Sequence, residues 1–179
     1  MVPSTPFDAK GLLAAAIQLD DPVIFLEPKV LYRAERQDVP TEPYTIPLGQ
    51  AKVRKEGSDV TIVTYGGMVP VSLRAAAAAE DEGISVEVID LRTLFPWDTQ
   101  TVMASVEKTS RLVVVQEPPR TLGPLAEVAA YVAENGAYLL EAPIRRVTGF
   151  DAPLPMLAIE HLALVDDRRV LSALREVME

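Results

Sequence analysis

Short apolar runs alternate with amphipathic stretches from about residue 50 to the end of the chain. Continuous apolar runs of this length are typical of strands buried on both faces, and apolar positions spaced three or four apart predict helices. The predicted strands and helices alternate strictly: strands at 59–65, 84–91, 111–117 and 138–149, helices at 66–83, 98–109, 123–136 and 166–178. This alternation gives βαβ units with a parallel sheet and right-handed crossovers. The polar run 51–57 predicts an additional edge strand, so the expected fold class is α/β with a mostly parallel sheet.

The beginning of the chain has a different pattern, because seven of the 15 prolines fall within its first 47 residues. Residues 4–19 predict a helix that Ser4 or Thr5 caps, with Pro6 in its first turn. The apolar run 21–28 is bounded by prolines and predicts a buried strand. The polar, proline-punctuated stretch that follows predicts a linker.

One helix and one strand cannot close a hydrophobic core by themselves. We therefore expect residues 1–30 to be the end of a domain whose beginning is absent, residues 31–48 to be a linker, and residues 49–179 to be a complete domain. The apolar side chains of the first region should then lack most of their partners: Leu12, Leu13, Ile17, Val23, Ile24 and Phe25.

Composition removes several classes of function. The net charge of -9 argues against sequence-independent nucleic-acid binding, which depends on Lys and Arg, and favours a basic partner instead. The absence of cysteine excludes disulfides, thiolate catalysis and cysteine metal sites. No apolar run approaches the roughly 18 residues of a membrane span, and the start of the chain lacks a signal-peptide pattern. We expect a cytoplasmic protein without a membrane anchor.

Two features suggest phosphate chemistry, and neither is complete. Gly66 and Gly67 stand between a predicted strand and helix, but G-x-G-x-x-G and the Lys-Ser/Thr of a P-loop are both missing, so a tight turn is favoured. Asp90, Glu117 and Glu141 lie near strand ends, as in a phospho-acceptor domain. The late strand end lacks the lysine that such a domain needs, which disfavours this interpretation.

The chain also lacks the parts of a catalytic site. His161 is the single histidine, and no G-x-S-x-G motif is present, so a nucleophilic triad cannot form. At the end of a predicted strand, Asp90 could pair with Arg92 or cap a neighbouring helix, and Trp97 could pack under the turn, so a structural role is favoured. We expect no catalytic and no cofactor-binding residue in this chain.

Four segments in order along the chain carry a family signature: 21–33, 39–66, 86–98 and 140–155. Together they resemble the β subunit of thiamine-diphosphate-dependent 2-oxoacid dehydrogenases. The sequence VPTEPYTIPLGQA is similar to the branched-chain (2-oxoisovalerate) members in particular, and the pyruvate enzyme is the alternative. A free-standing flavodoxin-like binding module is the alternative from another class. It would have no use for the helix and strand predicted at residues 4–27.

The resemblance implies a three-layer sandwich of the transketolase C-terminal-domain type, preceded by the tail of a pyrimidine-binding domain. The intact enzyme would decarboxylate a 2-oxo acid with thiamine diphosphate and Mg²⁺ and pass the acyl group to lipoyl. Its activating glutamate and proton-shuttling histidine belong to the absent part, so the chain alone should be inactive.

The resemblance also implies sites. Family members hold a structural potassium ion with backbone carbonyls, which would here belong to Ala16, Leu19 and Asp21. The implied partners are the α subunit of an α2β2 tetramer, a second β subunit, and the basic subunit-binding domain of the dihydrolipoyl acyltransferase. Glu141 and the terminal carboxylate of Glu179 are the expected contacts with that domain.

Overall fold

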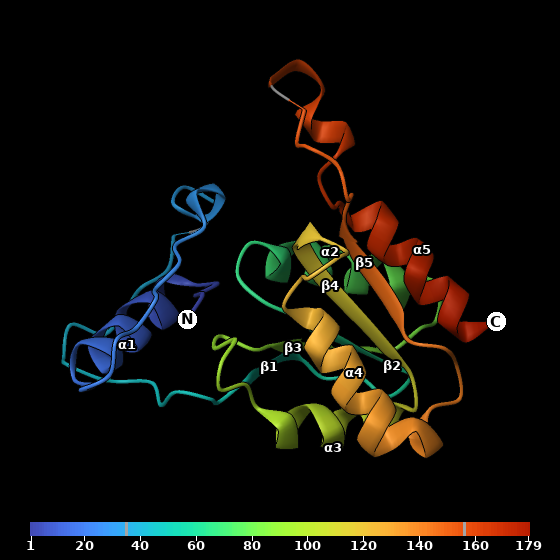
Figure 1. Ribbon diagram of the computed structural model, residues 1–179, viewed down its shortest axis with the longest axis horizontal. Coiled ribbons are helices and arrows are strands. Elements are labelled where there is room, and N and C mark those ends of the chain that lie inside the picture. Colours follow the sequence, from blue (N-terminus) through green and yellow to red (C-terminus); the bar gives the residue numbers. More distant parts are fainter. Residues whose placement is uncertain (35, 156) are drawn as a thin grey trace.

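A computed structural model describes residues 1–34, 36–155 and 157–179, and this part of the chain contains one five-stranded sheet (Figure 1). The strand order is β1-β3-β2-β4-β5. β1 pairs antiparallel with β3, and the remaining neighbours are parallel. The strand bounds are β1 Lys52–Lys55, β2 Val60–Thr64, β3 Val86–Asp90, β4 Leu112–Pro119 and β5 Arg145–Gly149.

Helices cover both faces of this sheet. α2 (Met68–Glu80) packs with α5 (Asp167–Met178) on one face, while α3 (Thr99–Thr109) and α4 (Leu125–Gly136) cover the other face (Figure 1). The predicted three-layer α/β sandwich with a mostly parallel sheet is therefore confirmed. Within the described residues, no helix combines the length and the apolar character that crossing a membrane would require.

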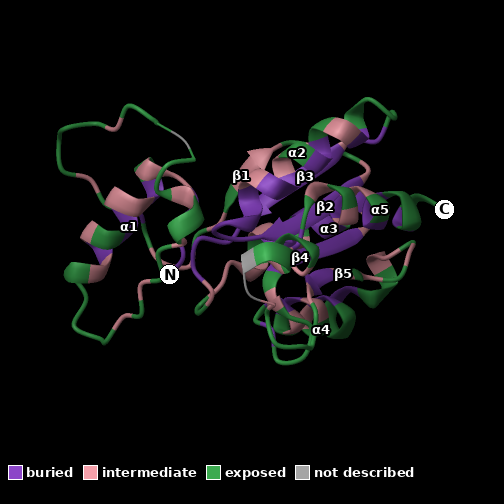
Figure 2. Ribbon diagram, turned by 90° about the horizontal axis from the view of Figure 1, so that it is seen from above, coloured by how far each residue is buried: buried purple, intermediate pink, exposed green. Residues whose placement is uncertain are grey.

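The two faces of the sheet bury separate aliphatic cores, seen as the purple strands between the helices in Figure 2. Neighbouring residues of β2 point to opposite faces, because successive side chains of a strand alternate. Ile62 therefore joins the core under α2 and α5, and Val63 joins the core under α3 and α4. Strands buried on both sides explain why the sequence shows continuous apolar runs instead of alternation.

Local signals set the helix ends. Thr5 caps α1 (Pro6–Ile17), Asp98 caps α3 and Asp166 caps α5, each by accepting the backbone N–H three residues later. Gly83, with a φ of 82°, follows α2 in the left-handed conformation that glycine adopts without a Cβ penalty. These helices begin and end within two or three residues of the predicted bounds.

The N-terminal segment, residues 1–31, holds α1 and the short 3-10 helix Lys29–Leu31. The strand predicted at 21–28 is wrong: residues 22–28 are all described and run as coil. Pro22 and Pro28 carry no N–H, and the amide of Leu26 bonds to the carbonyl of Met1 (2.9 Å) instead of to a sheet. The prediction of burial is wrong as well, because Val23 and Phe25 are only half-buried and Ile24 and Leu26 are exposed.

A small third core supports this segment. Leu12, which was expected to lack partners, is fully buried against Met1 and Ile46. Val23 and Phe25 pack against the same cluster, whereas Leu13, Ile17 and Ile24 are exposed as expected. The linker contributes Ile46, Tyr44 and Leu48 to this core, and it therefore closes over α1.

The last strand is shorter than the run 138–149 predicted. Residues Ala137–Leu139 form a 3-10 turn, and pairing with β4 begins only at Arg145. Pro143 interrupts the apolar run and donates no hydrogen bond, which explains the late start of the strand. A further 3-10 helix, Leu157–Leu162, lies in the long connection between β5 and α5.

Candidate functional site at the carboxyl edge of the sheet

The strand order creates a crevice between β2 and β4. After β2 the chain crosses to β3 on one side, and after β3 it returns to β4 on the other side of β2. Such a topological switch point separates the loops that leave neighbouring strands, and open α/β sheets bind ligands there, outside the carboxyl ends. The turn Tyr65–Gly67 after β2 and the Pro118–Pro119 end of β4 stand on its two sides.

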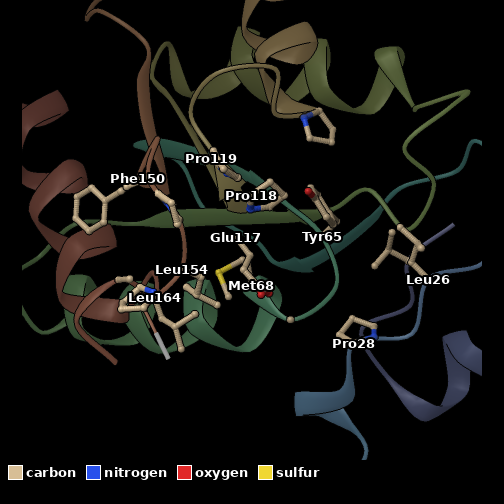
Figure 3. A pocket seen from close by; sticks show the side chains of 18 of the residues that line it. Leu26, Pro28, Tyr65, Met68, Glu117, Pro118, Pro119, Phe150, Leu154 and Leu164 are labelled. Carbon is tan, nitrogen blue, oxygen red and sulfur yellow. The ribbon is translucent and has the colours of Figure 1, made fainter. Parts of the chain in front are cut away.

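A cavity of about 810 Å³ opens at this switch point. We name it the switch-point cavity. Figure 3 shows Glu117 and Met68 near its centre, with Leu26 and Pro28 on one side and Phe150, Leu154 and Leu164 on the other. The N-terminal segment thus supplies part of the wall, and the segments that follow β2, β3, β4 and β5 supply the rest.

Few polar groups face this cavity. Tyr65 is buried, and this burial, together with the negative charge of Glu117, raises the pKa of its phenol to about 12. Glu117 and Glu27 are the charged residues among the described lining, and both are acidic. The Glu27 carboxylate accepts a hydrogen bond from the Tyr32 hydroxyl at 2.5 Å. The cavity is therefore mostly apolar, with a negative charge at its centre.

A buried charge network joins the N-terminal segment to the sheet beside this cavity. It comprises Ser4, Asp8, Arg54, Asp90 and Arg92. The Asp90 carboxylate, at the end of β3, is fully buried and accepts bonds from Arg54 Nη2 (2.8 Å) and Ser4 Oγ (2.5 Å). Asp8 of α1 pairs with Arg54 and with Arg92 Nη1 (3.3 Å). Burial raises the pKa of Asp90, although Arg54 and Ser4 oppose this shift.

Backbone bonds complete this connection. Val2 N donates to the carbonyl of Arg92 (2.8 Å), and Arg92 N donates to Asp90 Oδ1 (3.1 Å). Arg92 has a φ of 57°, a conformation that non-glycine residues adopt at a cost and that persists where the surroundings fix it. The predicted structural role of Asp90 and Arg92 agrees with these contacts, but their partners differ: Asp90 pairs with Arg54, and Arg92 with Asp8.

The two residues expected to contact the acyltransferase lie at the opposite edge of the sheet. Glu141 has 61% of its side chain exposed and pairs with Arg111 at 2.8 Å. Arg111 Nε also donates to the carbonyl of Val177, near the end of α5 and Glu179 (3.0 Å). We call Arg111, Glu141 and the end of α5 the amino-edge patch. The structure brings the two predicted residues into one region, and their docking role stays a prediction.

The residues expected at a potassium site lie at the end of α1 and in the turn that follows it. The carbonyl of Ala16 accepts the amide of Leu19 at 3.3 Å, and Leu19 and Asp21 are exposed. Among the described residues, no group of three or more His, Cys, Asp or Glu side chains could hold a metal ion. Potassium binding by carbonyls stays a prediction.

Other residues singled out by the sequence have structural environments. Trp97 packs edge-on against Tyr131 of α4, with ring centroids 5.2 Å apart. His161 is exposed in the 3-10 helix, away from any clustered acids in the described residues. Gln116, whose role the sequence did not reveal, is fully buried and accepts the amide of Leu125 at the start of α4 (2.9 Å). This contact between β4 and the start of α4 matches no sequence motif.

Comparison with known proteins assigns the domain. Residues 49–170 match the family described as Transketolase, C-terminal domain. The chain belongs to this family. A solved structure described as "Split gene transketolase, inactive beta4 tetramer" has a TM-score of 0.80 and 27% identity, over 99% of this chain and 56% of that one.

Curated relatives match over the full length of the chain. It is 50% identical to the pyruvate dehydrogenase E1 component subunit beta of Bacillus subtilis (strain 168), and this match covers 100% of the chain. The corresponding Staphylococcus aureus protein (strain Mu50 / ATCC 700699) is 48% identical over the same 179 residues. The chain spans about half the length of these relatives, since each match covers 55% of the relative.

Proposed function

We propose that this chain forms the C-terminal part of the β subunit of a thiamine-diphosphate-dependent 2-oxoacid dehydrogenase of the pyruvate type. The observation that carries the proposal is 50% identity over all 179 residues to a pyruvate dehydrogenase E1 β subunit. The sequence motifs alone pointed first to the branched-chain enzyme, with pyruvate as the alternative. The names of the relatives favour that alternative. The division at residues 30 and 48 belongs to the same proposal.

The residues present do not suit thiamine diphosphate. A diphosphate needs cationic or metal partners, and the charged groups of the described switch-point cavity lining are the carboxylates Glu27 and Glu117. The described residues also lack a three-ligand cluster for the accompanying Mg²⁺. In our proposal, cofactor binding and decarboxylation therefore belong to the rest of the assembled enzyme, and this chain serves assembly and docking.

The proposed partners are an α subunit and a second β subunit in an α2β2 tetramer, and the basic subunit-binding domain of an acyltransferase. The net charge of -9 supports a basic partner, because complementary charge accelerates and orients association. Within the amino-edge patch, Glu141 and the C-terminal carboxylate of Glu179 would face that partner. Arg111 holds the Glu141 carboxylate in place.

Assembly is tested by a chimera in which this chain replaces the matching 55% of the Bacillus subtilis β subunit, co-expressed with the α subunit of that organism. We expect a stable heterotetramer that decarboxylates pyruvate in the presence of thiamine diphosphate and Mg²⁺. A chimera that folds but does not associate with the α subunit would contradict the proposal. The unmodified Bacillus β subunit, prepared in parallel, is the control for expression and assembly.

Docking is tested separately with Glu141→Lys. Since Glu141 is 61% exposed, losing its attraction costs about 0–1 kcal/mol, and charge reversal should roughly double this at low salt. Affinity for the isolated acyltransferase subunit-binding domain should therefore fall about tenfold at low salt, with a smaller loss at high salt. Glu107→Lys, on the exposed side of α3, is the matched control. Equal affinities for both variants would remove Glu141 from the interface.

A further inference from the structure

The switch-point cavity has the size and position of a small-molecule site, although the proposed function makes no use of it. Its volume of about 810 Å³ lies within the range of about 300–1,000 Å³ of ligand pockets. It stands at the carboxyl ends of β2 and β4, where the strand order reverses, which is the preferred ligand position in open α/β sheets. The volume and the position in the sheet are thus two independent indications of a small-molecule site.

The lining restricts the class of ligand. Met68, Pro118 and Phe150 present carbon surface, so the body of a bound molecule must be apolar. The charged lining residues are Glu27 and Glu117, and the carboxylate of Glu27 is already engaged by Tyr32. An anionic ligand such as a phosphate or carboxylate would place its charge against two negative groups without a compensating cation in the described lining.

Glu117 is the polar group that a ligand could use. Within the described residues, its carboxylate makes neither a hydrogen bond nor an ion pair. It also lies beside the backbone of Gly67, where an added Cβ would stand 3.8 Å from Glu117 Oε2 and 3.8 Å from Pro28 Cβ. Figure 3 shows its carboxylate at the centre of the apolar lining. Glu117 is also exposed, so an approaching cation would meet an accessible carboxylate beside the apolar lining.

Arg169 contacts a residue of the lining, but it does not pair with Glu117. Arg169 stacks on the ring of Phe150 at 4.7 Å, but it is not part of the cavity lining, and its Nη2 donates to the carbonyl of Thr148 (2.6 Å). The Tyr65 phenol stays neutral at physiological pH, because its pKa is about 12, and it can stack on or donate to a ligand. The lining therefore carries the negative charges of Glu27 and Glu117, and the Glu27 carboxylate already accepts a hydrogen bond from Tyr32.

We propose that the switch-point cavity binds a small amphipathic cation, with its apolar body between Pro28, Met68 and Phe150 and its ammonium group against Glu117. Binding requires the N-terminal segment to be in place, since Leu26 and Pro28 form one wall. The ligand class follows from charge complementarity and from the carbon lining.

The test compares three probes of one shape: 4-phenylbutylammonium, 4-phenylbutanol and 4-phenylbutyrate. They are titrated into the full chain while the methyl resonances of Met68 and Leu154 are followed by NMR. The ammonium probe should bind about fivefold more tightly than the alcohol, as expected for one exposed ion pair, and the carboxylate should bind most weakly. Glu117→Gln should remove the advantage of the ammonium probe, whereas the matched variant Glu107→Gln on α3 should retain it.

Two results would overturn the proposal. One is equal affinity for the ammonium and carboxylate probes, which would separate any binding from Glu117. The other is the absence of a saturable change in the methyl resonances with all three probes. Sedimentation at the same protein concentration would then show whether a second copy of the chain covers the cavity. The alcohol probe and Glu117→Gln, which retains the shape of the side chain, keep the test independent of folding defects.

Discussion

The α/β domain and the N-terminal segment of the same chain are stabilised by different interactions. In the domain, two aliphatic cores cover both faces of the sheet, and residues such as Ile62 and Val63 are fully buried in them. The N-terminal segment has one small apolar cluster around Leu12, and it attaches to the sheet through Val2 and the buried charge network. The domain thus depends on non-directional packing, whereas the segment depends on a few specific partners.

This difference has a physical consequence. Apolar packing is spread over many side chains, so a single deletion weakens it by a fraction of the whole. A buried ion pair contributes little net stability when intact, but removal of one partner leaves an uncompensated charge in a dry environment. A single charge change in the network should therefore weaken the attachment of residues 1–31. A charge change on the exposed surface of the domain should have little effect on its stability.

The largest expected effect is that of Ile62→Ala in the domain, compared with Ile24→Ala in the N-terminal segment. Ile62→Ala, in the core beneath α2 and α5, should lower the free energy of unfolding by about 4 kcal/mol, since it leaves a cavity in packed strands. Ile24→Ala, in the N-terminal segment at 76% exposure, should change it by less than about 0.5 kcal/mol. Urea unfolding followed by circular dichroism measures both, and similar losses would remove the contrast between the regions.

The second effect should be confined to the attachment of the segment. Arg54→Met removes the cation between Asp8 and Asp90 and should weaken this attachment by about 3 kcal/mol. Limited proteolysis should then release peptides from residues 1–31 while the sheet stays intact. Lys52→Met, a matched change at an exposed position of β1, should leave the digestion pattern unchanged.

The smallest effect concerns Asp98, which accepts the amides of Thr101 (3.0 Å) and Ala51 (2.9 Å) and so connects α3 to the start of β1. Burial raises the pKa of Asp98, but these donors outweigh it and hold the pKa below its usual value. The stabilisation is therefore complete above the unfolded pKa of about 4 and is lost as the pH falls through the lower folded pKa. Asp98→Asn should cost about 1 kcal/mol at pH 7.

The pH dependence provides the check on that value. Below pH 4, the difference in the free energy of unfolding between wild type and Asp98→Asn should shrink in urea unfolding, because the wild-type carboxylate loses its charge by protonation. A difference that stays constant from pH 7 to pH 2.5 would show that the carboxylate charge is not involved.

Much of the α/β domain was predictable, because its strands and helices follow from local patterns. Apolar runs predicted β2, β3 and β4, and the amphipathic run 98–109 predicted α3, which Asp98 caps. The run 21–28 forms neither a strand nor a buried segment, because strand pairing and burial both depend on partners elsewhere in the chain. Pro143 has no N–H to donate, and β5 begins only after it, at Arg145.

The site was less predictable, since its contacts join distant parts of the chain. Asp8, Arg54 and Asp90 are separated by about 40 residues at each step, and nothing local to any of them indicates the others. The sequence indicated Asp90, Arg92 and Glu117 from their places near strand ends, but not the contacts that they make. The switch-point cavity likewise depends on strand order and on the path of residues 26–28, which sequence patterns do not specify.

The central claim is that the buried charge network decides whether the N-terminal segment stays on the sheet. Amide hydrogen exchange, measured by mass spectrometry on wild type, Arg54→Met and Lys52→Met, tests it most directly. We predict that Arg54→Met loses protection throughout residues 1–31, keeps the wild-type protection of β2 and β4, and that Lys52→Met matches wild type everywhere. Unchanged protection of residues 1–31 in Arg54→Met, or an equal loss across the sheet, would contradict this account.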